Sequence, residues 1–159
     1  MQTITGYTSK NNNRSGEHLL MSLTYIAKKT KTNTGVQLTR AFEHWRRCFE
    51  ENGITSALVV SESYLIQNIQ GSRPVINHAL AKIISEYLEI LPHVIEVEEV
   101  EVRKWNGFLI KYLTSNAQDE KYTLKNFSAG ADFNPYLMKS TQITSFLKSI
   151  FEEKESIEL

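Results

Sequence analysis

The sequence predicts an α+β fold of the ferredoxin-like type, in which one sheet carries two helices on the same face. The first observation is the order of elements, β-α-β-β-α-β-β-α, because the first six form a split βαβ pattern. The second is a pair of long apolar stripes at spacings of three and four, which indicate amphipathic helices. The third is a length of 159 residues with 41% hydrophobic and 23% charged residues, which is typical of one globular domain. The last amphipathic segment predicts a C-terminal helical extension.

The first strand and the first helix are predicted over residues 19–27 and 36–52. In the strand, Tyr25 shares its face with three apolar residues at period two. In the helix, Phe49 belongs to the apolar stripe, so we expect it to be buried. Gly53 suits the left-handed conformation that often ends a helix.

The second and third strands are predicted over residues 54–61 and 64–70, and Gly71 is expected to break the third. Gln67 lies between two apolar residues of one face of the third strand. An unsatisfied buried amide costs about 1–3 kcal/mol, so Gln67 must have hydrogen-bond partners. Tyr25 lies on the equivalent face of the first strand, so we expect both side chains to point toward the helices, where the hydroxyl and the amide could meet. By itself this pair has a purely structural interpretation.

The remaining elements are a second helix, two strands and a final helix. The second helix is predicted over residues 74–91, where Pro92 ends the cleanest apolar stripe of the chain. The strands are predicted over residues 94–102 and 105–113. The first of them alternates valine or isoleucine with glutamate, so one of its faces should be wet. The final helix is predicted over residues 137–153.

Composition and patterning divide the chain into three parts. Residues 1–16 are predicted to be a flexible arm, 17–113 the compact domain, and 114–159 an extension with one amphipathic helix. The 18 basic residues balance the 18 acidic ones, which argues against non-specific nucleic-acid binding. No apolar run approaches the roughly 20 residues of a membrane helix, and the N-terminus lacks a signal-peptide core. We therefore expect a cytoplasmic protein with no membrane partner.

Catalytic and metal-binding patterns are weak. The single cysteine, Cys48, excludes an intrachain disulfide and a multi-cysteine zinc site. His44 lies four residues before it, but two ligands do not make a metal site. No phosphate-binding glycine loop and no nucleophile elbow occur. The sequence therefore predicts neither a metal centre nor an enzyme.

Three segments of the chain are similar to a known family. They are the LTYIA stretch at 23–27, the stretch NGITSALVVSESYLIQNIQG at 52–71 with the SRPV that follows, and the segment at Trp105. Together they resemble the BLUF domain, a flavin-based blue-light sensor. The resemblance implies FAD held non-covalently between the two helices. It also implies that Tyr25 gives an electron and a proton to the flavin, that Gln67 then rearranges its hydrogen bonds, and that Trp105 is the tryptophan of the fifth strand.

The resemblance assigns Tyr25, Phe49, Leu58 and Gln67 to the cofactor site, with one departure that matters most. Phe49 stands where the family usually has an asparagine that bonds the flavin. A phenylalanine could line an apolar flavin pocket or fill it, but it cannot replace two amide hydrogen bonds. A second departure is Ser56, which stands where the family has glycine.

Two functions follow from the resemblance. The first is a blue-light-responsive signalling module that binds FAD and regulates a protein partner through the open sheet face or the last helix. The second is a flavin-free relative used as a protein-interaction module, in which the Tyr25–Gln67 pair is structural. Self-association into a homo-oligomer is compatible with either.

Overall fold

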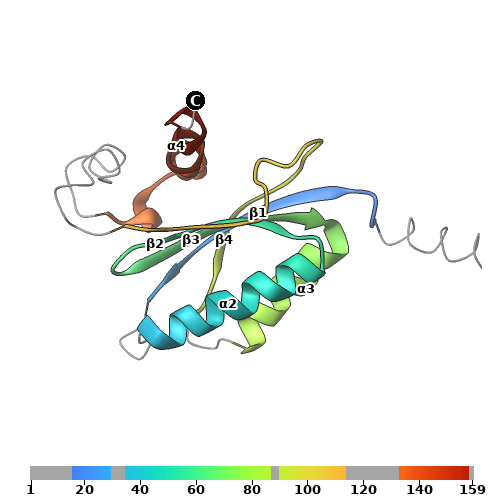
Figure 1. Cartoon of the computed structure of the whole chain (residues 1–159), viewed down its shortest axis with the longest axis horizontal. Helices are drawn as coiled ribbons and strands as arrows, with labels where there is room; N and C mark the ends of the chain where they lie inside the picture. The colour runs from blue at the N-terminus through green and yellow to red at the C-terminus, as the bar shows by residue number, and fades with distance from the viewer. Residues whose placement is uncertain (1–15, 30–34, 87–89, 114–132, 158–159) are drawn as a thin grey trace, which may run out of the picture.

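A five-stranded sheet forms the centre of the molecule. The computed structural model describes residues 16–29, 35–86, 90–113 and 133–157. The strands stand in the order β4-β1-β3-β2-β5, antiparallel except for β5, which runs parallel to β2. Figure 1 shows the sheet as the central layer, with α4 on one side of it and α2 and α3 on the other. Their bounds are Leu20–Lys28 for β1, Thr55–Val60 for β2, Tyr64–Ser72 for β3, His93–Glu99 for β4 and Phe108–Tyr112 for β5. The predicted ferredoxin-like arrangement is confirmed.

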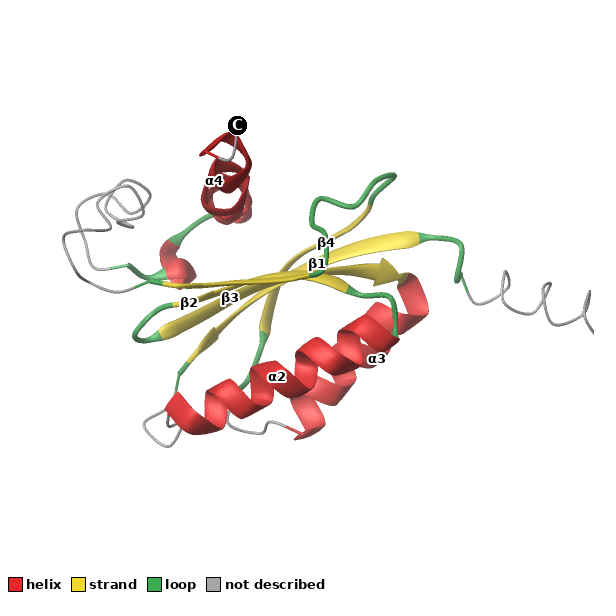
Figure 2. Cartoon of the chain, viewed as in Figure 1, coloured by secondary structure: helices red, strands yellow, loops and turns green. Residues whose placement is uncertain are grey.

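Helices cover both faces of this sheet. Helices α2 and α3 lie on one face and α4 lies on the other, as Figure 2 shows. Their bounds are Gly35–Glu51 for α2, Arg73–Glu86 for α3 and Ser140–Ile157 for α4, and a short 3-10 turn, η3, spans Pro135–Leu137. The predicted C-terminal helix therefore packs on the sheet of its own chain. Within the described residues, no helix is both long and apolar enough to cross a membrane.

The two faces of the sheet have separate apolar cores. The first lies under α2 and α3, and the second lies under α4. Successive side chains of a strand point to opposite faces, so each buried strand contributes to both cores. In β3, for example, Leu65 and Ile69 belong to the first core and Ile66 to the second. This sorting decides which polar side chains can meet.

Several predicted boundaries were wrong, and each has a local reason. Gly71 does not break β3, because it still pairs with Met21, and a Cβ at this position would lie 3.3 Å from Ile76 Cδ1 of α3. Helix α3 ends at Glu86, not at residue 91. Residues 87–89 of the predicted helix lie outside the described residues, and Leu91 is exposed and non-helical. Gly53 has a φ of 67°, which confirms the predicted left-handed end of α2.

The last predicted strands and helix also shift. Strand β4 ends at Glu99, three residues early, and β5 begins at Phe108, three residues late. Helix α4 begins at Ser140 because the preceding residues form the 3-10 turn, where Leu137 is 78% exposed. The proposed divisions after residues 16 and 113 stay predictions.

Candidate functional site

Tyr25 and Gln67 form a buried polar pair on the side of α2 and α3. They stand directly opposite each other in the antiparallel pairing of β1 with β3. The Tyr25 hydroxyl donates to Gln67 Oε1, and both side chains are fully buried. Burial raises the pKa of the Tyr25 phenol well above its usual value, so this hydroxyl keeps its proton at physiological pH. The common face expected from the alternation is confirmed.

A third residue, Ser56, completes this polar group. Gln67 Nε2 donates to Ser56 Oγ at 2.8 Å, and Ser56 is fully buried on the neighbouring strand β2. From the sequence, Ser56 is only a departure from the family pattern and not a predicted site residue. The signal was present, because Ser56 has the same parity in β2 as Leu58, which stands opposite Gln67.

A cleft of about 300 Å3 opens between α2 and α3. Its volume is at the lower end of the range for small-molecule sites. Its apolar wall includes Trp45 and Phe49 of α2 and Ile83 of α3, while His78 and Lys82 add polar groups. None of Tyr25, Leu58 and Gln67 lines it. The cleft and the buried polar pair are therefore separate in this conformation.

Phe49 lines the cleft and belongs to the same apolar core as Tyr25 and Leu58. Its side chain is only 4% exposed, and its ring centroid lies 5.8 Å from that of Phe108 in β5. Asn52, the nearest amide along the helix, also lines the cleft, but its Nδ2 donates to the Cys48 carbonyl at 2.7 Å. Position 49 thus carries a phenylalanine in place of the asparagine of the family, and the nearby Asn52 directs its amide nitrogen back to its own helix.

Polar side chains at the mouth of the cleft form a loose group. His44 Nε2 lies 3.6 Å from Cys48 Sγ and 3.8 Å from Glu86 Oε2, and all three residues line the cleft. Both contacts use the same ring nitrogen, so His44 cannot relay a proton between the two groups through opposite ring nitrogens. Among the described residues, no group of three or more histidine, cysteine and carboxylate side chains could hold a metal ion.

Trp105 lies on the opposite face of the sheet from Tyr25 and Gln67. Its Nε1 donates to Asn68 Oδ1 at 2.7 Å, and its ring packs edge-on against Phe151 of α4 with centroids 5.7 Å apart. The structure thus does not bring the three expected photoactive residues together. The expectation assumed that the fifth strand begins at Trp105, whereas Trp105 belongs to the segment that crosses from β4 to β5.

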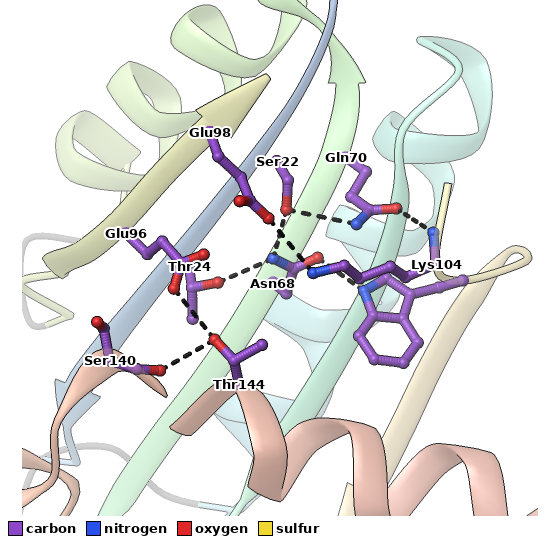
Figure 3. Close-up of polar contacts among 10 residues, drawn as sticks. Ser22, Thr24, Asn68, Gln70, Glu96, Glu98, Lys104, Ser140 and Thr144 are labelled. Atoms are coloured by element: carbon purple, nitrogen blue, oxygen red, sulfur yellow. Dashed lines mark hydrogen bonds and ion pairs between the residues drawn. The ribbon is translucent and has the colours of Figure 1, made fainter. Parts of the chain in front are cut away.

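Asn68, the acceptor of the Trp105 indole N–H, belongs to a polar network with Ser22, Thr24 and Gln70, which Figure 3 shows. Asn68 Nδ2 donates to Ser22 Oγ at 2.9 Å and to Thr24 Oγ1 at 2.8 Å. Gln70 joins it by donating to Ser22 and accepting from the backbone N–H of Lys104. The alternation along the strands did not predict this network, because its residues lie on the sheet face that was expected to be open and not covered by a helix.

The comparison with protein families identifies the family of this chain. The family model described as "Sensors of blue-light using FAD" (BLUF) matches residues 20–111, more than half of the chain. The chain belongs to the BLUF family. BLUF domains are sensors that use flavin, and the buried Tyr25–Gln67 pair lies within the matched range. No curated protein sequence matches the chain at significant similarity.

Solved BLUF structures share the fold at low sequence identity. "BlsA photo-activated state" is 19% identical, with a TM-score of 0.67, covering 81% of this chain and 92% of that one. "BlrB - a BLUF protein, dark state structure" is 16% identical, with a TM-score of 0.63, covering 83% and 95%. "Structure of a bacterial light-regulated adenylyl cyclase" is 15% identical, with a TM-score of 0.57, covering 87% of this chain and 36% of that much longer one.

The chemistry of the buried groups fits a flavin ring, whose edge is polar and whose faces are apolar. Gln67 Nε2 carries two hydrogens, and among the described side chains Ser56 Oγ is the acceptor of one of them. A buried N–H without an acceptor is costly, so this amide suits a ligand with acceptor atoms. Trp45 and Phe49 offer ring faces for packing. Because Phe49 lines the cleft and Gln67 does not, the wall must move before a ring edge can reach the amide.

Proposed function

We propose that this BLUF domain is a blue-light-responsive signalling module that binds FAD non-covalently between α2 and α3 and regulates a partner protein. One observation carries the proposal. A protonated Tyr25 hydroxyl and the Gln67 amide are joined in the core on the side of α2 and α3, and Ser56 is the one hydrogen-bond acceptor of the amide nitrogen among the described residues. In a purely structural pair the second amide hydrogen stays unpaired at a cost in stability, whereas a ligand with an acceptor atom would satisfy it.

Each residue of the site has a defined task in this proposal. Gln67 donates from its amide to the edge of the ring, and Tyr25 supplies a hydroxyl proton to the same amide group. Leu58, fully buried opposite Gln67, packs beside the amide and keeps water away. Trp45 and Phe49 contact the ring faces. When bound, the flavin supplies absorption of blue light and an acceptor for an electron.

The output of the module is proposed to reach a partner through α4. This helix buries Ile143, Phe146 and Ile150 against the sheet face that is opposite α2 and α3 (Figure 1). Thr144 Oγ1 also donates to Glu96 Oε2 of β4 at 3.1 Å. A change in the sheet would therefore change how α4 sits, and a partner protein or a second copy of the chain that binds α4 would sense it. The light-regulated adenylyl cyclase is a solved structure with the same fold in a longer chain.

A second candidate function, a flavin-free interaction module, is favoured by Phe49. Its buried ring packs against Phe108 and leaves the cleft short of Gln67. In that case Tyr25, Gln67 and Ser56 serve the stability of the core alone, and α4 is the functional surface.

An absorption spectrum of the purified protein, before and after incubation with FAD, separates the two functions. The proposal predicts blue absorption that stays with the protein through gel filtration and changes on illumination with blue light. Gln67→Leu is the control, because it removes the amide without emptying the core. Failure to retain FAD at any concentration tested would overturn the proposal in favour of the flavin-free module.

A further inference from the structure

We infer that Ser56 is the positioning residue of the Gln67 amide and holds it by a hydrogen bond in either of two orientations. The three side chains Tyr25, Gln67 and Ser56 form one chain of hydrogen bonds across β1, β3 and β2. All three are fully buried, so water does not compete with these bonds. The inference concerns the proposed flavin site, but the contact with Ser56 exists without a ligand.

The chemistry of the two flanking groups permits both orientations. In the structure, Tyr25 donates to Gln67 Oε1 and Gln67 Nε2 donates to Ser56 Oγ. If the amide turns by half a revolution, Nε2 faces Tyr25 Oη and Oε1 faces the Ser56 hydroxyl. A hydroxyl donates or accepts as its hydrogen rotates, so Ser56 then donates to Oε1. A residue without a hydroxyl would leave one end of the amide without this partner in either orientation.

The backbone holds Ser56 firmly enough for this task. Its N–H donates to the Gly107 carbonyl at 2.9 Å, and the residue lies in register between Ile69 of β3 and Phe108 of β5. The preceding Thr55 accepts from Arg103 Nη1 at 3.1 Å. Ser56 is therefore fixed from both neighbouring strands, and its side chain is directed at the amide.

The nitrogen-bound protons of the Gln67 side chain test the inference in the flavin-free protein. We expect Ser56→Ala to shift their NMR signals and to speed their exchange with solvent about tenfold, as the loss of one buried hydrogen bond implies. Ser22→Ala is the matched control, because Ser22 is also a buried serine that accepts from a β3 amide, but on the other face. It should move the Asn68 side-chain signals and leave those of Gln67 in place.

Two further measurements keep the result decisive. If Ser56→Ala loses the native backbone spectrum, Ser56→Cys keeps the shape with a much weaker hydrogen-bonding group and should give the same shift. With FAD bound, Ser56→Ala should speed the return to the dark state about tenfold, because both orientations of the amide lose a hydrogen bond that must break before the amide can turn. Unchanged Gln67 signals in both variants would overturn the inference even if FAD binds. Shifted signals in a chain that never binds FAD would support it while the proposed function fails.

Discussion

Replacing Phe49 with asparagine should tighten FAD binding and at the same time destabilise the flavin-free protein. The Phe49 side chain is only 4% exposed, and its ring packs on that of Phe108. Removing a buried phenylalanine ring costs about 3–5 kcal/mol of folding free energy. The new amide supplies hydrogen bonds to the ring edge that are worth about 1–3 kcal/mol, or about 5- to 150-fold in Kd.

The assay is a titration of FAD followed by quenching of flavin fluorescence, together with urea unfolding of each protein without FAD. Phe49→Leu is the matched control, since it shortens the side chain without adding an amide. We expect tighter binding in the asparagine variant than in the leucine variant, and destabilisation in both. Equal tight binding in wild type and Phe49→Asn would refute the reasoning, because another group would then already serve the ring edge. Absence of binding in all three would favour the flavin-free module.

Three other changes give distinct outcomes. Tyr25→Phe should keep FAD bound and abolish the light-induced spectral shift, because the ring packing survives and the hydroxyl is lost; an intact photocycle would contradict the carried-over role. Trp105→Phe should lower the free energy of unfolding by about 1–3 kcal/mol through the orphaned Asn68 carbonyl, as urea titration would measure, and leave the Kd for FAD unchanged because it lies on the other face. Because burial raises the pKa of Tyr25, its contribution to stability should be complete below about pH 10 and be lost as the pH rises further, when the unfolded tyrosine ionises first. The unfolding free energy of wild type relative to Tyr25→Phe should then fall by about 1.4 kcal/mol per pH unit, and a flat difference would contradict the burial.

The orientation of the central pair could be predicted from the chain alone. Period-two alternation places Tyr25 and Gln67 on the same faces as the apolar residues of their strands. Because these apolar residues point into a core, Tyr25 and Gln67 must point into it as well. The spacing of three and four in α2 likewise predicts the burial of Phe49. These inferences use only local geometry, which each segment carries in its own sequence.

Tertiary structure decided which of these residues meet. The pairing register sets Tyr25 directly opposite Gln67 and brings Ser56 to the other end of the amide, and no single strand encodes the register of its neighbours. Trp105 lies in the segment between β4 and β5, outside both strands. Period-two alternation therefore does not predict the face of the sheet on which it lies. Helix α4, which lies far along the chain, covers the second face of the sheet. An apolar sheet face must be buried against another element, and the sequence of the strands does not say which element this will be.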